Sequence, residues 1–235
     1  MRRFVILSAT ILSFNSCSVL QKSAKQELSD GFYKKKTATE STKVYVDMAD
    51  ETIRIHPTQK GLKQIVIDTL QSCELYQPEI KTKENITFKV LKNSFDVDFL
   101  SIPLKYRFSE KGVPPQLNTN LNGAIYLGYR TDIYQINYRQ NPVKMAVRHT
   151  NHFGYSVGLF TGLGNTFMSP TNTNNILQQE YDGIVWSKGI AGIVGINNFT
   201  VGLTLGVDNL LDKNKSIWIY ENKPWVGLAF GLNLN

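Results

Sequence analysis

The chain has 235 residues, of which 42% are hydrophobic and 19% charged, and its formal net charge is +7. This length suits one good-sized domain, or one domain with a small appendage. Apart from Lys34, Lys35 and Lys36, the basic residues are scattered singly along the chain. A nucleic-acid surface needs clustered positive charge, so we expect no nucleic-acid partner. We interpret the basic residues as solvated surface with an affinity for anionic lipid headgroups.

Cysteines and histidines give no sign of a metal site. The two cysteines, Cys17 and Cys73, are too few for a disulfide framework and lack the Cys-x-x-Cys spacing of a metal site. His149 and His152 are three residues apart, but their neighbourhood resembles a strand rather than a helix. We therefore expect exposed histidines near a turn, with no bound metal and no cofactor.

Residues 1–16 have the pattern of a secretory signal peptide. Two arginines precede an apolar stretch over 4–14, which is too short to span a bilayer, where about 20 residues are needed. The end of this segment, Ser16 followed by Cys17, resembles a lipoprotein signal, in which a small residue precedes a cysteine that is cut and acylated. The resemblance implies that Cys17 is lipidated and tethers the mature chain to a membrane. The alternative is an ordinary signal with a chance cysteine.

The middle of the chain predicts a tether and a small extended segment. Residues 17–42 are polar and rich in Lys, Ser and Thr, which is typical of a flexible tether. Apolar and polar residues alternate over 43–48 and again over 52–56, which predicts a β-hairpin. We assign it to a small periplasmic segment over 43–84, in which 62–75 fits either a helix or a strand.

From residue 85 onward glycines and aromatics become frequent and the two-residue period of strands dominates. No stretch of 18 apolar residues occurs, so any membrane span here must be made of strands. The pattern predicts about eight strands, at 86–92, 97–108, 121–130, 133–139, 145–167, 184–196, 199–211 and 225–234. The sequence therefore predicts an all-β fold: an antiparallel, up-and-down transmembrane β-barrel of about eight strands over 85–235, with a small N-terminal extended segment.

The alternation within these strands predicts which face meets lipid. Over 199–211 the bulky apolar residues Val201, Leu203, Leu205 and Val207 alternate with Thr200, Gly202, Thr204, Gly206 and Asp208. The segment 225–234 alternates in the same way, with Gly and Ala opposite Val, Leu and Phe. In a membrane barrel the bulky apolar face points out to lipid and the small or polar face points in. Glycine on the inner face leaves room in a narrow barrel for larger interior groups.

Four charged residues are predicted to face the lumen: Lys105, Arg107, Arg130 and Asp208. Lys105 and Arg107 alternate with a bulky apolar set, which the pattern assigns to the outer face: Leu100, Ile102, Leu104, Tyr106 and Phe108. Buried charges must be paired, so we expect a polar, charge-paired plug rather than an open pore. Aromatic residues near strand ends predict an outer interfacial girdle, made of Tyr106, Phe108, Tyr126, Tyr129, Tyr155, Trp186, Phe199 and Trp225.

The connections predict an orientation. Asn197 and Asn198 form a tight turn between two strong strands, whereas 168–182 and 212–224 are long and polar. Membrane barrels have short periplasmic turns and longer outside loops. We therefore expect the two long connections to face outward, where they could bind other envelope proteins.

The run 95–108 (FDVDFLSIPLKYRF) resembles the small porin-like or OmpA-like outer-membrane barrels of Gram-negative bacteria. The glycine-alternating strands extend the resemblance over 85–235. It implies a fold, a location in the cell outer membrane and contact with outer-membrane lipid. Function does not carry over, because proteins of this group differ widely in what they do.

Three functions are compatible with this pattern. The first is a non-enzymatic outer-membrane protein with a structural or binding role, anchored by lipid. The second is a soluble, lipid-anchored periplasmic β-barrel that binds a hydrophobic ligand and needs an apolar interior. The third is a membrane-embedded lipid hydrolase or acyltransferase, for which the candidate residues are His149, His152, Ser156 and Glu180. Their spacing does not require a catalytic triad, so we expect no enzyme.

Overall fold

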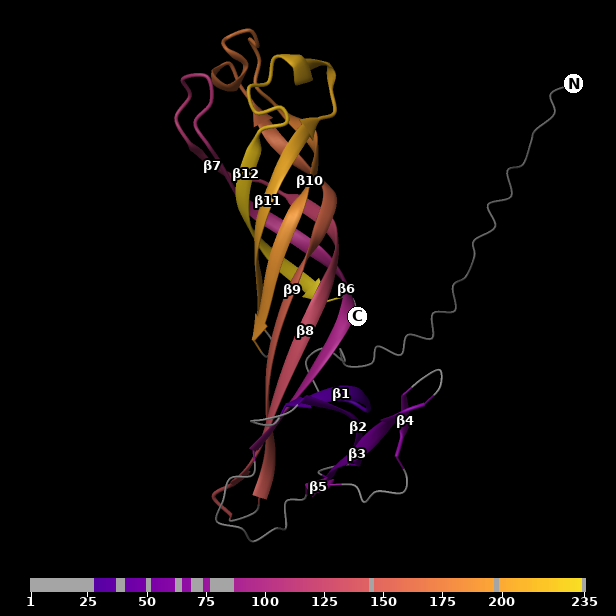
Figure 1. Ribbon diagram of the computed structural model, residues 1–235. Helices are drawn as coiled ribbons and strands as arrows, with labels where there is room; N and C mark the ends of the chain where they lie inside the picture. The colour runs from indigo at the N-terminus through magenta and orange to yellow at the C-terminus, as the bar shows by residue number, and fades with distance from the viewer. Residues whose placement is uncertain are drawn as a thin grey trace, which may run out of the picture.

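The fold is all-β and antiparallel in a computed structural model of the chain (Figure 1). The structure describes residues 28–36, 41–49, 52–61, 65–68, 74–76, 87–143, 146–196 and 199–233. The predicted signal peptide over 1–16 and Cys17 lie outside the described residues. Within the described ranges no helix is long and apolar enough to cross a membrane. The prediction of an all-β antiparallel fold is confirmed.

Six long strands form a closed ring, called here the closed sheet. They are β6 (Thr87–Arg107), β8 (Asn122–Gln140), β9 (Ala146–Met168), β10 (Tyr181–Ile196), β11 (Phe199–Leu210) and β12 (Pro224–Asn233). Each pairs antiparallel with the next, and β12 also pairs with β6, so the hydrogen-bonded path returns to its start. The short strand β7 (Gln116–Thr119) comes just before β8 in the sequence and also pairs with β6. Figure 1 shows these strands coiling around a common axis.

The ring contains six strands, where the sequence predicted about eight. The segments 86–92 and 97–108 belong to one strand, β6, and 121–130 and 133–139 belong to β8. Polar residues such as Asp96 and Asp132 interrupt the apolar pattern and resemble turn residues in the sequence. Both are buried within strands that continue past them, so they do not mark turns.

The connections of the closed sheet differ strongly in length at its two ends. Ile196 pairs with Phe199, so only two residues join β10 to β11. The connections over 108–115, 169–180 and 211–223 gather at the opposite end, at the top of Figure 1. Two of them contain short 3-10 helices, Thr171–Thr173 and Lys213–Ser216.

Five short strands near the N-terminus form a second part, called here the N-terminal sheet. They are β1 (Gly31–Lys36), β2 (Ser41–Ala49), β3 (Thr52–Lys60), β4 (Ile65–Ile67) and β5 (Glu74–Tyr76). β2 and β3 pair antiparallel in the region where alternation predicts a hairpin. β1 lies in the range 17–42, which the sequence predicted to be a flexible tether. Tyr33 anchors β1 through a buried side chain, but Lys34, Lys35 and Lys36 follow it in the sequence and hide the strand pattern.

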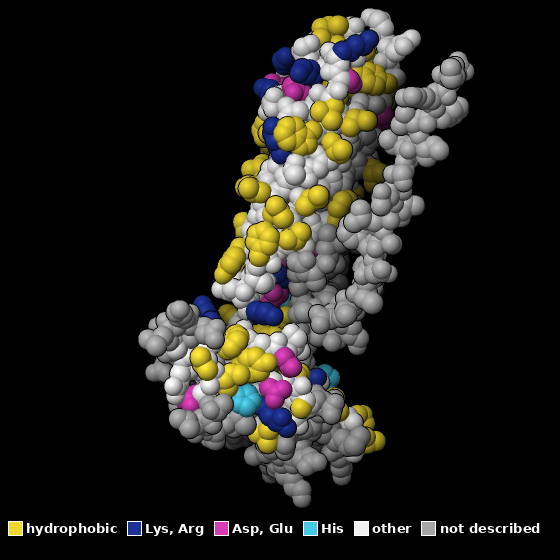
Figure 2. Space-filling view, turned by 90° about the vertical axis from the view of Figure 1, so that its right-hand side faces the viewer, with side chains coloured by type: hydrophobic (Ala, Val, Ile, Leu, Met, Phe, Trp, Pro, Cys, Tyr) yellow, Lys and Arg dark blue, Asp and Glu magenta, His cyan; other side chains and the backbone are white. Residues whose placement is uncertain are grey.

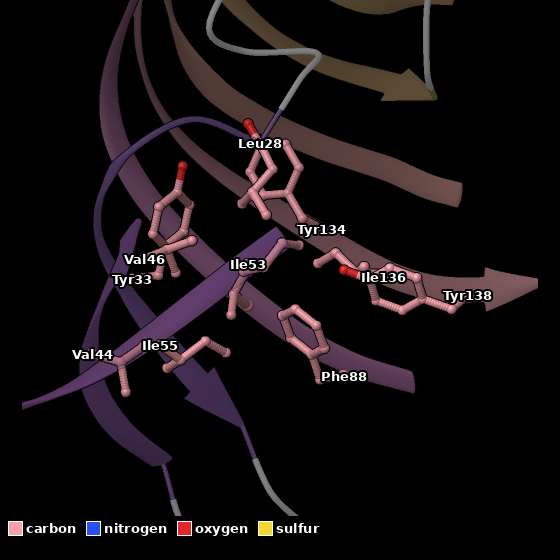
Figure 3. Close-up of a cluster of buried hydrophobic side chains, with 11 residues drawn as sticks. Leu28, Tyr33, Val44, Val46, Ile53, Ile55, Phe88, Tyr134, Ile136 and Tyr138 are labelled. Atoms are coloured by element: carbon pink, nitrogen blue, oxygen red, sulfur yellow. The ribbon is translucent and has the colours of Figure 1, made fainter. Parts of the chain in front are cut away.

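A small core joins the N-terminal sheet to the lower ends of β6 and β8 (Figure 3). Its buried side chains are Leu28, Tyr33, Val44, Val46, Ile53, Ile55, Phe88, Val90, Tyr134, Ile136 and Tyr138. The rings of Tyr33 and Tyr134 meet edge to face, with centroids 6.0 Å apart. β1 also pairs with β6 through Lys34 and Leu91. The N-terminal sheet is therefore attached to the first part of β6, which comes before the part that pairs with β12.

A bulge at Pro103 changes the inward face of β6. Against β12, Ser101 pairs with Phe230 and Leu104 with Leu228, so two β6 residues oppose one β12 residue. Proline lacks an N–H for the ladder and is found at such bulges. A one-residue shift exchanges the two faces of a strand.

As a result, Leu100 and Ile102 are buried inside the closed sheet, and so are Lys105 and Arg107. Leu100 and Ile102 had been predicted on the outer face, which is wrong. Tyr106 and Phe108 lie beyond the bulge and are exposed, as the predicted alternation requires.

Two aromatics predicted for the outer girdle lie inside. Trp225 and Tyr126 are fully buried. The predicted aromatics with exposed side chains are Tyr106, Phe108, Tyr129, Tyr155 and Trp186, and the side chain of Phe199 is outside the described part. Trp225 shares the strand face of Gly227, and Tyr126 shares that of Arg130. The alternation along each strand, rather than the aromatic character, decides the direction of these side chains.

Candidate functional site

The outer surface of the closed sheet is apolar. Its exposed large hydrophobic side chains include Phe95, Ile125, Leu127, Tyr129, Val157, Leu159, Leu163, Ile184, Ile190, Leu203, Leu205 and Phe230. They come from all six strands of the ring. Figure 2 shows hydrophobic side chains spread along this column, with Lys and Arg side chains toward its ends. Soluble monomers rarely expose contiguous apolar patches larger than a few hundred Å².

The interior of the closed sheet carries the charges. The buried polar and charged residues on its strands are Asp96, Asp98, Lys105, Arg107, Arg130, Asp132, His152, Ser156, Ser187, Thr204 and Asp208, of which His152 lies just below the last β9–β10 pair. Charged side chains are almost never fully buried in proteins unless they are paired. The interior also holds an apolar cluster that includes Leu100, Phe160 and Trp225, so paired charges and apolar side chains share the interior, while the outer wall is apolar.

The upper charged cluster gathers residues from β6, β10 and β11. Lys105 Nζ lies 3.1 Å from both carboxylate oxygens of Asp208 and 2.9 Å from Ser187 Oγ. Ser187 Oγ in turn donates to Asp208 Oδ1 at 2.6 Å. Arg107 Nη2 donates to Asp208 Oδ2. One buried carboxylate thus accepts charge-assisted hydrogen bonds from two buried cations.

Aromatic rings share in stabilising these two cations. Lys105 Nζ lies 4.4 Å from the ring centroid of Trp225. Arg107 Cζ lies 5.0 Å and 5.3 Å from the ring centroids of Trp218 and Tyr220. Both rings belong to the connection over 211–223, which folds over this end of the sheet. Burial raises the pKa of the Tyr220 phenol, so it remains neutral beside Arg107. Two cations share the single carboxylate of Asp208, and the cation–π contacts offset the positive charge that remains.

A second, lower cluster is centred on Asp132. Its Oδ1 lies 2.8 Å from Arg130 Nε and 2.6 Å from His152 Nε2. The His152 ring stacks on Tyr134 at 4.8 Å between centroids. The prediction that His152 is exposed is wrong, because it lies on the inward face of β9, whereas His149 is exposed.

The structure places all four predicted lumen residues inside the closed sheet, in two groups. Lys105, Arg107 and Asp208 lie together, whereas Arg130 belongs to the lower cluster with Asp132. Asp132 was not predicted from the sequence as a partner of Arg130. The two are separated by two positions on one strand and therefore share a face, which was the available signal.

The candidate catalytic residues do not form a triad. Ser156 Oγ is 2.7 Å from Tyr126 OH, and His152 bonds to Asp132. Ser156 and His152 are four residues apart on one extended strand, which separates them by about 13 Å. Glu180 is exposed. Across the described ranges, no group of three His, Cys, Asp or Glu side chains is placed to hold a metal ion.

Comparison with protein-family models, with curated proteins and with solved structures finds no match. The distribution of apolar and charged side chains over the closed sheet therefore carries the functional conclusions.

Proposed function

We propose that the chain is a non-enzymatic protein of the Gram-negative outer membrane, with a structural or binding role at the cell envelope. The observation that carries the proposal is the apolar outer wall of the closed sheet, which surrounds an interior that contains paired charges. Aliphatic side chains such as Leu203 and Leu205 are exposed, while Lys105, Arg107 and Asp208 are buried. Lipid stabilises the first set, and mutual pairing stabilises the second.

The backbone of the closed sheet suits a bilayer. Lipid offers no partner for a free N–H or C=O, so a spanning sheet must close on itself. The pairing of β12 with β6 closes the ring. The shorter strands, β11 and β12, have 12 and 10 residues, and a tilted membrane strand needs about 9–11. We therefore place the bilayer around the part of the sheet in which all six strands are paired.

The interior is proposed to act as a plug rather than a pore. The largest fully buried side chains include Trp225, Arg107, Tyr126 and Lys105, all inside the closed sheet. An eight-stranded barrel is just wide enough to be filled by side chains, and six strands enclose less. A structural or binding role fits this interior better than transport does.

The proposed orientation puts the N-terminal sheet and the two-residue connection after Ile196 in the periplasm. The connections predicted over 168–182 and 212–224 then face the exterior and are the proposed contact sites for envelope partners. Acylation of Cys17 would add a lipid anchor on the periplasmic side. An anchor with several acyl chains holds a protein to a membrane far more firmly than one chain does.

A soluble barrel that binds a hydrophobic ligand is the main alternative, and the interior argues against it. Such a protein needs an open apolar lumen, whereas this interior is filled by apolar side chains such as Trp225 and by the paired charges of Asp208, Lys105 and Arg107. It would also expose Val157 and Leu203 to water, each at 60% or more of its surface.

The test is membrane extraction followed by gel analysis of the full chain and of Cys17→Ala, which lacks the proposed lipid anchor. We expect the protein to stay with the membrane pellet in alkaline carbonate, to need detergent for solution, and to migrate differently before and after boiling. A closed sheet has no edge strand at which to unzip, which explains the heat-dependent migration. Release by carbonate as a detergent-free, heat-labile monomer would refute the proposal.

A further inference from the structure

A group of lysines, called here the basic patch, lies where β1 joins the N-terminal sheet to β6. It consists of Lys34 and Lys36 of β1, Lys43 of β2 and Lys89 of β6, and all four side chains are exposed. Lys34 pairs with Lys43 on one side and with Leu91 of β6 on the other. Lys36 and Lys89 are each two residues from that row, and the antiparallel pairing puts both on the same side of it. The fold therefore gathers four ammonium groups from three strands on one face.

The positive charge of the basic patch is not neutralised by other described residues. Like charges directly opposite each other on neighbouring strands are destabilising, and Lys34 and Lys43 form such a pair. None of the four lysines has an ion pair with a described residue. The ion-paired acids of the N-terminal sheet bind other side chains: Glu74 with Lys35, and Asp47 with Arg54 and His56. An anion from outside the protein would therefore stabilise the basic patch.

The basic patch continues the apolar outer wall of the closed sheet. On the same face of β6, Leu91 is followed by Phe95 and Phe99, which are exposed on that wall. Phe95 lies four residues after Leu91, which is about 13 Å along a strand and roughly 10 Å along the axis of a barrel whose strands tilt by about 35–45°. Figure 2 shows Lys or Arg side chains where the hydrophobic column meets the N-terminal sheet. A bilayer around the column would therefore place its headgroups at the basic patch.

We propose that the basic patch binds the headgroup phosphates of anionic phospholipids in the periplasmic leaflet. The inference rests on the proposed function, because that function places Phe95 against acyl chains and the lysines beside the headgroups of the same leaflet. Ammonium groups donate to phosphate oxygens, and an anionic lipid surface attracts clustered lysines. Bound headgroups would also hold the N-terminal sheet at the membrane surface.

The experiment titrates the full-length protein in neutral detergent micelles by calorimetry, with protein-free micelles as the blank. Four probes are compared: dihexanoylphosphatidylglycerol, the zwitterionic dihexanoylphosphatidylcholine, glycerol phosphate and octathymidylate. We expect saturable binding of the phosphatidylglycerol that weakens as salt is added, because the contact is electrostatic. The other three should bind about tenfold more weakly or less, because the choline cancels the phosphate charge and the last two probes lack acyl chains to contact the apolar wall.

Substitutions test which lysines bind the headgroup. Lys34→Gln should weaken binding of the phosphatidylglycerol about fivefold, the usual effect of one lysine near an anionic lipid surface. Lys34→Gln combined with Lys89→Gln should weaken it about 25-fold. Lys34→Arg keeps the charge and should bind within about twofold of the wild type. Lys111→Gln, at an exposed lysine in the connection over 108–115, is the control and should have no effect.

Equal affinity for the two phospholipids, or unchanged affinity in the double variant, would overturn the headgroup site. So would glycerol phosphate that binds as tightly as the phosphatidylglycerol, which would indicate a site for free phosphate, or octathymidylate that binds more tightly, which would indicate a nucleic-acid site. Heat-dependent gel migration is recorded for every variant. A wild type that shows this migration but does not select the phosphatidylglycerol refutes the basic patch alone, whereas a wild type without the migration refutes the membrane assignment.

Discussion

Arg107 on β6 and Asp208 on β11 form a buried ion pair, although β12 lies between their two strands. Their side chains are 2% and 0% exposed. Lys105 contacts the same carboxylate at 3.1 Å. The pair thus links β6 to β11 across the point where the ring closes, and we expect this carboxylate to stabilise the closure together with the β12–β6 pairing.

Asp208→Asn is expected to destabilise the protein by about 3–5 kcal/mol, because it leaves two buried cations without a counter-ion. Lys105→Met should cost less, since Arg107 and Asp208 then remain as a one-to-one pair. The measurement is denaturant unfolding of protein folded into lipid vesicles. Glu180→Gln, at an exposed carboxylate, is the control and should have little effect. Equal losses for Asp208→Asn and Lys105→Met would show that the carboxylate has no special role.

Leu205→Arg tests the membrane assignment directly. Leu205 is exposed near the middle of β11, and an arginine at the bilayer midplane of a barrel costs about 2–4 kcal/mol. Leu211 is also exposed but follows the end of β11, so Leu211→Arg should cost only about 0–1 kcal/mol. Both variants are compared by unfolding from vesicles. If Leu205→Arg proves as harmless as Leu211→Arg, this face does not meet lipid.

The faces of unbroken strands could be predicted from the sequence, and those of β6 could not. Along β11 the two-residue period places Leu203 and Leu205 outside and Asp208 inside, as the structure has them. Along β6 the Pro103 bulge exchanges the inward and outward faces, although the kinds of residue before and after the bulge are the same. Leu100 therefore has the same pattern as an outward residue although it is buried.

The pairing of the buried charges could not be predicted from the sequence either. Alternation indicates that Lys105, Arg107 and Asp208 point inward, but not which of them meet. The stagger of the strands around the ring decides that, and it depends on the hydrogen-bond register of the whole sheet. Asp132 was missed for another reason: a charged residue within a strand has the same sequence pattern as a turn.

Tyr33→Ala should detach the N-terminal sheet and leave the closed sheet intact. Tyr33 is buried in the small core and packs against Tyr134, and truncating a large buried aromatic costs about 3–5 kcal/mol. Phe32, the preceding residue on β1, is exposed, so Phe32→Ala is the matched control. Limited proteolysis should cut Tyr33→Ala faster within 28–76, while its heat-dependent gel migration is unchanged. Loss of that migration would mean that the two parts fold as one unit.

Lipidation of Cys17 is tested by metabolic labelling with a fatty acid. The motive is the apolar stretch that ends at Ser16 and Cys17. We expect label in the wild type and in Cys73→Ala, the matched control, and none in Cys17→Ala. Label that persists in Cys17→Ala would point to an ordinary signal peptide with acylation elsewhere.

Gly206 on β11 lies beside two large side chains inside the closed sheet. A Cβ at this position would stand 2.7 Å from Trp225 Cζ2 and 2.9 Å from Phe160 Cζ. Gly206→Ala is therefore expected to cost about 1–3 kcal/mol through overpacking. Gly192 on β10 offers a matched control, because a Cβ there would meet nothing within 4 Å, and Gly192→Ala should stay within about 0.5 kcal/mol of the wild type.

Trp225→Leu should relieve the overpacking caused by Gly206→Ala, because it removes the closest ring. The free energy of unfolding of the double variant should therefore be higher than the sum of the two single effects predicts, with a coupling of about 0.5–3 kcal/mol. The three variants and the wild type are unfolded from the same vesicles by denaturant. Additive effects, or equal costs for Gly206→Ala and Gly192→Ala, would mean that the interior is not filled at this level and would reopen the case for a lumen.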